Sequence, residues 1–151
     1  MIRLLRTDAG NRDFQALVAC LDEDLAIRDG LDHSFYAQFN TLHNIQCALV
    51  AYDDEKFIGC GATKPYAEEI AEVKRMYTLP AYRGMGIASL VLQELEKWVG
   101  ELSFTKIILE TGKNQPEAIA LYLKSGYRRI DNYGQYAGIA NSLCFEKQLK
   151  K

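Results

Sequence analysis

An arginine and two glycines in the middle of this sequence have the residue types and spacing of a phosphate-binding loop. Arg83, Gly84 and Gly86 stand together. A polar, β-branched run ends at residues 78–80 just before them, and an amphipathic helical pattern over residues 87–99 comes just after. The N–H groups in the first turn of a helix have no partners inside the helix, and with the helix dipole they bind anions. Glycine leaves the backbone open to a phosphate, and arginine adds a permanent positive charge. The stretch therefore predicts a pyrophosphate cradle between a strand and a helix.

Two other interpretations of the glycines are open at this point, and the simpler is a pair of turn or helix-cap glycines. The other is a dinucleotide fingerprint, because Gly84, Gly86 and Ser89 have its spacing, with serine as the third small residue. Glu110 also stands where a ribose-binding acid belongs. The five residues between Thr78 and Gly84 are too many for the tight turn of that motif, and an antiparallel meander precedes it. The sequence has no G-x-x-x-x-G-K-S/T loop, so nucleotide hydrolysis is not indicated.

The elements that must position these residues follow from hydrophobic periodicity and turn residues. Strands are predicted at residues 2–6, 46–52, 56–63, 72–78, 106–111, 127–131 and 142–148. Helices are predicted from Asn11 to Gly30, from a cap at Asp32 through Phe35, Tyr36 and Phe39, over residues 87–99, and from Pro116 to Gly126. This order predicts a single α/β (α+β) domain over residues 1–151. Its sheet is mixed, mostly antiparallel and six- to seven-stranded, with helices on both faces.

Composition limits the class of protein and of partner. The chain has 151 residues, of which 48% are hydrophobic and 25% charged, with a net charge of −2. These values are typical of a soluble globular domain and offer no broad basic field for nucleic acid or for a membrane. Apolar runs fall short of the roughly 20 residues that span a bilayer, and no signal-peptide core begins the chain, so a cytoplasmic location is expected. Four scattered cysteines and two histidines have no metal-binding spacing, and we expect reduced thiols and no metal.

Two motifs in the second half of the sequence resemble the GNAT family of N-acetyltransferases. The family's signature of Arg or Gln, two residues, Gly, one residue, and then Gly or Ala is matched by Arg83, Gly86 and Ala88. The segment at residues 118–127, AIALYLKSGY, is similar to the family's A-x-x-L-Y-x-x-x-G-F/Y segment. Both motifs fall on the elements that the family requires. The resemblance covers about residues 46–148 by motif and the whole chain by element order.

The resemblance implies the acyl-CoA N-acyltransferase fold, with acetyl-CoA as co-substrate. The pyrophosphate would lie on backbone N–H groups of residues 83–88. The pantetheine arm would pair like an extra strand with the edge exposed where the strands at residues 72–78 and 106–111 splay apart. A backbone N–H there could also stabilise an oxyanion. Gln115 departs from the pattern, because the family often has asparagine there. The implied contacts of acetyl-CoA are Met76, Tyr77, Thr78, Arg83, Gly84, Met85, Gly86, Ile87, Ala88, Ser89, Gln115 and Tyr122.

Acetyl transfer to an amine requires an ammonium group to lose a proton before attack and a thiolate to gain one as it departs. The resemblance implies Glu72, four residues before Met76, as the base and Tyr122 as the acid. Simpler interpretations stay open for both residues. Glu72 could be an exposed strand residue paired with Lys74, and Tyr122 a core aromatic residue. A cysteine nucleophile is less favoured, because Cys60 lies mid-strand with no histidine near it in the sequence.

The acceptor is predicted to be a small-molecule primary amine that also carries a carboxylate. Its pocket should be formed by the two N-terminal helices and the loops at residues 65–69 and 133–136. Alternation puts Lys74 on the face of Glu72, where its ammonium could hold the carboxylate, and Arg75 on the opposite face. Buried charges need partners, which makes both residues notable in a central strand. The candidate lining residues in the N-terminal segment are His33, Tyr36 and Asn40.

Three other functions stay open on the sequence. They are a catalytically silent acyl-CoA-binding module or sensor, a protein N-acetyltransferase, and a dehydrogenase. The presence of candidates at both Glu72 and Tyr122 favours an enzyme. A single compact domain without a docking module favours a small acceptor. Members of the family are often dimers, so the resemblance also leaves a homodimer open.

Overall fold

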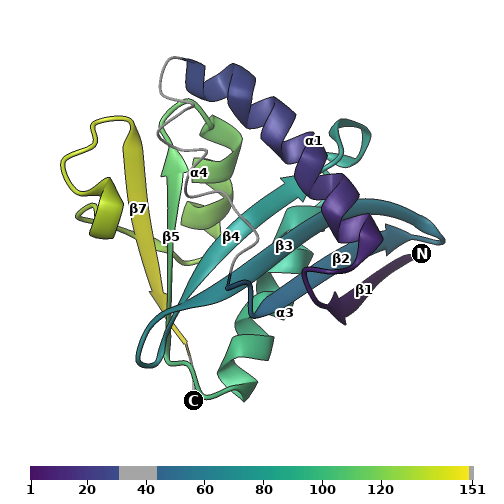
Figure 1. The fold of residues 1–151 in the computed structure, drawn as a ribbon, viewed down its shortest axis with the longest axis horizontal. Coiled ribbons are helices and arrows are strands. Elements are labelled where there is room, and N and C mark those ends of the chain that lie inside the picture. Colours follow the sequence, from purple (N-terminus) through teal and green to yellow (C-terminus); the bar gives the residue numbers. More distant parts are fainter. Residues whose placement is uncertain (31–43, 150–151) are drawn as a thin grey trace.

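The computed structural model describes residues 1–30 and 44–149, and Figure 1 shows their arrangement. The strands are β1 (Ile2–Thr7), β2 (Cys47–Asp53), β3 (Lys56–Ala67), β4 (Ile70–Thr78), β5 (Lys106–Gly112), β6 (Arg128–Ile130) and β7 (Ser142–Gln148). The helices are α1 (Arg12–Asp29), α3 (Ile87–Glu101) and α4 (Pro116–Lys124), with short 3-10 turns η2 (Pro80–Tyr82) and η3 (Gly134–Tyr136). The short helix expected after Asp32 lies outside the described residues.

The strands form one sheet in the order β1-β2-β3-β4-β5-β7-β6. β4 and β5 run parallel, and all other neighbours in this sheet are antiparallel. The predicted mixed, mostly antiparallel sheet is therefore confirmed. The loop predicted at residues 65–69 is wrong for the most part, because the β3–β4 ladder continues past Pro65 to the pair Ala67 and Ile70. Glu69 closes the tight turn with a φ of 61°.

The core has two layers, because alternate residues of β2 point to opposite faces of the sheet. Ala48 and Val50 cluster with Phe14 of α1. Leu49 clusters with Leu95 of α3 on the other side. Figure 1 shows α1 in front of the sheet and α3 and α4 behind it, so helices cover both faces as predicted.

β4 and β5 separate after a short junction. Three consecutive residues of β4, starting at Ile70, pair with three of β5, starting at Lys106. β4 then continues to Thr78 and β5 to Gly112. The β3–β4 register shifts beside Arg75, which has a φ of 59°. Such a bulge bends a strand and increases its twist. The two strands consequently diverge into a V, which is visible between them in Figure 1.

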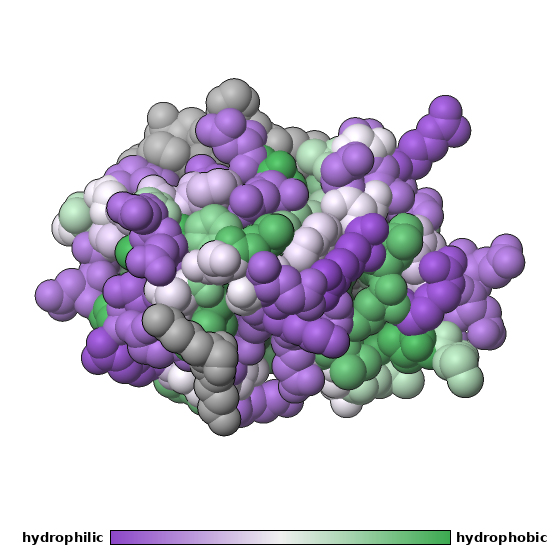
Figure 2. Space-filling model, turned by 90° about the horizontal axis from the view of Figure 1, so that it is seen from below, coloured by the Kyte–Doolittle hydropathy of each residue, from purple (hydrophilic) through white to green (hydrophobic). Residues whose placement is uncertain are grey.

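The surface mixes polar and apolar side chains. Figure 2 shows a face that is mostly hydrophilic, with hydrophobic residues gathered toward one side. Leu90 of α3 and Leu123 of α4 are exposed, so the outer faces of these two helices are not uniformly polar. Within residues 1–30 and 44–149, the helices are too short or too polar to cross a membrane.

Candidate active site

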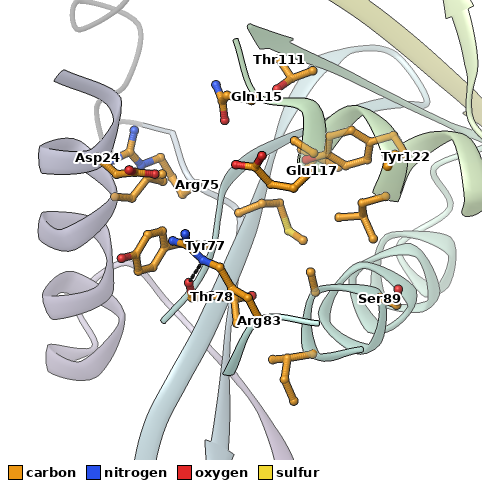
Figure 3. Close-up of a pocket in the computed structure, with 18 of the residues that line it drawn as sticks. Asp24, Arg75, Tyr77, Thr78, Arg83, Ser89, Thr111, Gln115, Glu117 and Tyr122 are labelled. Atoms are coloured by element: carbon orange, nitrogen blue, oxygen red, sulfur yellow. Dashed lines mark hydrogen bonds between the residues drawn. The ribbon is translucent and has the colours of Figure 1, made fainter. Parts of the chain in front are cut away.

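A cleft of about 480 Å³ lies where β4 and β5 diverge. β4 contributes residues 73–78 to its lining, the end of β5 contributes residues 110–112, and the glycine loop and first turn of α3 form another wall. Figure 3 shows α1 on one side of the cleft and α4 on the other, with Glu117 of α4 pointing between them. The cleft thus joins the predicted phosphate cradle to the splayed strands.

The glycine loop is open to the cleft. Gly84 has a φ of 80° and Gly86 a φ of 81°, which is a left-handed conformation that side chains disfavour. A Cβ on either glycine would meet no atom within 4 Å. Gly86 is the N-cap of α3, and the first turn of this helix carries no acidic residue. The start of α3 is therefore accessible and carries no acidic side chain in its first turn, and an accessible helix start suits an anion.

Arg83 is held beside the loop by two contacts. Its Nε donates to the Thr78 carbonyl at 2.9 Å, and its guanidinium lies 5.4 Å from the centre of the Tyr77 ring. Figure 3 shows the hydrogen bond as a dashed line. The contacts fix a permanent cation at the edge of the cleft. All the residues implied to contact acetyl-CoA line this cleft except Met85, which is 65% exposed.

Tyr122 belongs to both the core and the cleft. Its ring packs on Tyr127, with 5.7 Å between ring centres, and on Phe145, and only 5% of the residue is exposed. It also lines the cleft. Burial, and to a lesser degree the negative charge of Glu110, raise the pKa of Tyr122 above its ordinary value. The phenol is therefore protonated at neutral pH, as a proton donor must be.

Glu72 and Lys74 form a buried pair. The Glu72 Oε2 lies 3.3 Å from Lys74 Nζ, and the two side chains are only 2% and 9% exposed. The Tyr133 hydroxyl donates to the same oxygen at 2.6 Å. The interpretation of Glu72 as an exposed strand residue is therefore wrong. Lys74 lines the cleft and donates to the Tyr136 hydroxyl at 3.2 Å, whereas Glu72 lies behind it, outside the lining.

The bulge at Arg75 changes the direction of its side chain. The guanidinium forms an ion pair with Asp22 of α1 and is 1% exposed. Lys74 is paired with Ala62 of β3, which packs against α1, so Lys74 is on the α1 face as well. The prediction that alternation separates Lys74 and Arg75 onto opposite faces is wrong, because the bulge interrupts the alternation.

Sequence reasoning missed the role of one residue that lines the cleft and named a second only as part of the loop at residues 133–136. Glu110 of β5 lines the cleft, although the sequence suggested it only as a ribose-binding acid. It is the first polar residue after the buried run at residues 107–109, and that position was the available signal. Tyr136 also lines the cleft and is 2% exposed. The predicted lining residues His33, Tyr36 and Asn40 lie outside the described residues.

The remaining candidates are placed as follows. The Tyr66 and Tyr133 rings lie 5.1 Å apart, which brings together the two segments predicted to flank the acceptor.

Cys60 is buried and its Sγ donates to the Arg75 carbonyl at 3.3 Å. Desolvation raises the pKa of Cys60 to about 12, so it is a poor nucleophile. In the part of the chain that the structure describes, no group of three or more His, Cys, Asp or Glu residues could hold a metal ion.

The family model, the sequence relatives and the solved structures that match this chain agree with one another. Residues 14–127 match the model of the acetyltransferase (GNAT) family. An IAA acetyltransferase of Azospirillum brasilense is 36% identical over 102 residues, which is 67% of each chain. A crystal structure assigned as an acyl-CoA N-acyltransferase, from Klebsiella pneumoniae, is 29% identical with a TM-score of 0.82 and covers 99% of both chains. The PaiA N-acetyltransferase of Thermoplasma acidophilum, solved with coenzyme A, is 20% identical with a TM-score of 0.73, over 98% of this chain and 99% of that one.

These similarities agree with the glycine loop, the splayed strands and the tyrosine of α4. The family match covers most of the described chain and includes both sequence motifs. The fold predicted from the resemblance is confirmed by the structural neighbours. The chain therefore belongs to the GNAT family, a family of acyltransferases.

Proposed function

We propose that this protein transfers the acetyl group of acetyl-CoA directly to the primary amine of a small molecule. One observation carries the proposal: an open glycine loop, the diverging edge of β4 and the phenol of Tyr122 meet in a single cleft. The first two features suit a pyrophosphate and an extended amide-bearing chain. The third is a proton donor where a thiol must leave.

The residues present fit acetyl-CoA. A phosphate can approach Gly84 and Gly86 through the space that a Cβ would occupy. The Leu79 N–H donates to the Ile58 carbonyl of β3 at 2.8 Å. Because successive residues of a strand direct their backbone groups to opposite sides, those of Thr78 point away from β3. The Thr78 carbonyl accepts the hydrogen bond from Arg83, and the Thr78 N–H would hold the pantetheine arm. When bound, acetyl-CoA supplies the thioester and the thiol leaving group.

Two carboxylates are candidates for removing a proton from the ammonium group. Glu110 lines the cleft directly. Glu72 is connected to the cleft through Lys74, which contacts the lining residue Tyr136. The Tyr122 hydroxyl then donates a proton to the departing sulfur. A buried phenol next to a carboxylate keeps its proton until charge develops on the leaving group.

The experiment is an assay of CoA release from acetyl-CoA with a panel of amino acids, polyamines, aminoglycosides and lysine-containing peptides. Mass spectrometry of the acceptors identifies the acetylated product. We expect release with at least one free small molecule. Release only with peptides or intact proteins would overturn the small-molecule part of the proposal. Binding of acetyl-CoA without release for any acceptor would instead indicate a silent acyl-CoA-binding module.

A further inference from the structure

Lys74 and Glu110 lie on the two strands that flank the V, on the same face of the sheet. The last residues paired between these strands are Glu72 of β4 and Ile108 of β5. Side chains on a strand alternate with a period of two. The next residues on this face are therefore Lys74 and Glu110, at the point where the strands diverge. Both line the cleft, and the charge of Glu110 acts on the Lys74 ammonium. A cation and an anion thus stand on opposite sides of the opening.

The surroundings of Lys74 leave it suited to an incoming anion. Its Nζ lies 3.3 Å from the Glu72 carboxylate and donates to the Tyr136 hydroxyl at 3.2 Å. The same Glu72 oxygen also accepts the hydrogen bond from Tyr133. An ammonium group has three N–H donors, and these contacts use two of them among the described residues. Burial lowers the pKa of Lys74, which means that its charge is incompletely compensated by its neighbours.

We infer that the acceptor is an amine with a carboxylate close to its ammonium group, as in an α-amino acid. Lys74 and the Tyr136 hydroxyl hold the carboxylate, and Glu110 receives the ammonium. This inference rests on the proposed acetyl transfer and specifies its substrate class. When an amine without a carboxylate binds, Lys74 is covered without gaining an anion. The charge-assisted hydrogen bond between Lys74 and the acceptor is then not formed.

The transfer balances with these residues. Glu110 takes one proton from the ammonium group, and the neutral nitrogen attacks the carbonyl carbon of the thioester. The N–C bond forms and the C–S bond breaks. Tyr122 delivers a proton to the departing sulfur. The nitrogen then loses its second proton, which restores the phenol of Tyr122. The products are the N-acetylated amino acid, free CoA and one proton that Glu110 releases to solvent.

Matched pairs of acceptors test the inference on the intact protein. Each pair consists of an α-amino acid and the amine left by its decarboxylation, such as phenylalanine and phenethylamine or lysine and cadaverine. We expect kcat/KM for the amino acid to exceed that of its partner by on the order of 10- to 100-fold, which is the effect of a hydrogen bond to a charged group. The ratio should fall to about one in Lys74→Met and be largely retained in Lys74→Arg. Lys97→Met, an exposed lysine on α3 outside the cleft lining, is the matched control and should keep both the ratio and the rate.

A second variant guards against loss of folding. Lys74→Met leaves Glu72 buried without its cation, so Glu72→Gln/Lys74→Met removes both charges together. A uniform loss of rate cancels in the ratio, which should again be about one. Equal or faster turnover of the decarboxylated partner by the unaltered protein would overturn the inference and leave acetyl transfer standing. Acetyl-CoA binding without CoA release for either member of every pair would overturn both proposals.

Discussion

The Tyr133 hydroxyl donates a 2.6 Å hydrogen bond to Glu72, a residue 61 positions away in the sequence. This contact joins the loop between β6 and β7 to the first part of β4. The loop also carries Tyr136, whose hydroxyl accepts a hydrogen bond from Lys74. One wall of the cleft is therefore fixed from behind by a network of buried polar groups.

Tyr133→Phe removes this donor and leaves a buried carboxylate with one partner fewer. The free energy of unfolding should fall by about 1–3 kcal/mol, because the lost hydrogen bond is to a charged group. Urea unfolding followed by circular dichroism measures the change. Tyr66→Phe is the control, since Tyr66 packs on the same ring but is 42% exposed. Its effect should stay within about 0.5 kcal/mol, and equal effects of the two variants would contradict the importance of the contact.

Gly86→Ala should abolish or strongly weaken acetyl-CoA binding. The new Cβ occupies the space through which a phosphate would approach, and the φ of 81° adds strain. Gly138→Ala is a matched control, because Gly138 has a φ of 78°, an equally open surrounding and a position outside the cleft. Isothermal titration should show normal affinity in the control and little or no heat in Gly86→Ala. Tight binding of NAD by the unaltered protein would contradict the assignment of the loop to CoA.

Tyr122→Phe should lower kcat by on the order of 10²- to 10⁴-fold, the usual contribution of general acid catalysis. Its affinity for acetyl-CoA should change little, because the hydroxyl acts only as the thiolate departs. Tyr127→Phe is the control, since the neighbouring ring donates its hydroxyl to Glu96 at 2.8 Å. That variant should lose stability while keeping kcat. Wild-type turnover in Tyr122→Phe would show that Tyr122 is a core aromatic residue only.

The pH dependence of kcat/KM separates the two candidate bases. Replacing the base by glutamine leaves the ammonium to lose its proton to solvent, so the rate should rise only toward the higher pKa of the free amine. Glu110→Gln and Glu72→Gln are compared over the same pH range. A shift to higher pH in Glu72→Gln alone would support the base implied by the family resemblance. A shift in Glu110→Gln alone would assign the role to the residue that lines the cleft.

Alkaline pH should destabilise the protein steeply. Burial raises the pKa of several tyrosines above the ordinary 10.0, among them Tyr122 and Tyr136 of the cleft lining and the rings packed on them, Tyr127 and Tyr133. A folded-state pKa above the unfolded value gives stability that is complete below pH 10 and lost as the pH rises further. Each group contributes roughly 1.4 kcal/mol per pH unit in that window. The lowered pKa of Lys74 acts in the opposite direction, but only at pH values below the ordinary lysine value of 10.5. Urea unfolding at pH 9 and pH 11 measures this loss, and equal stability at the two values would contradict it.

The cradle could be predicted from sequence because its geometry is local. Gly84 and Gly86 have positive φ angles, which glycine adopts without strain, and α3 follows immediately. The burial of Lys74 and Arg75 could not be predicted from the sequence. Lys74 is buried by a loop some 60 residues away in the sequence, and Arg75 forms an ion pair with α1. Strict alternation also failed at Arg75, since a one-residue bulge leaves no mark in the hydrophobic pattern. Tyr122 was predicted from its motif. The position of Glu110 in the cleft depends on the point at which β5 separates from β4, and no residue type in the sequence indicates that point.

The short junction of β4 and β5 has a mechanical consequence. β5 pairs with β7 at seven positions but with β4 at three, so β1–β4 and β5–β7 are two stiff half-sheets joined by a narrow seam. An extended chain of amides that paired with the diverging edges of β4 and β5 would bridge the two half-sheets. Binding of such a ligand would therefore make the connection between the two half-sheets more rigid.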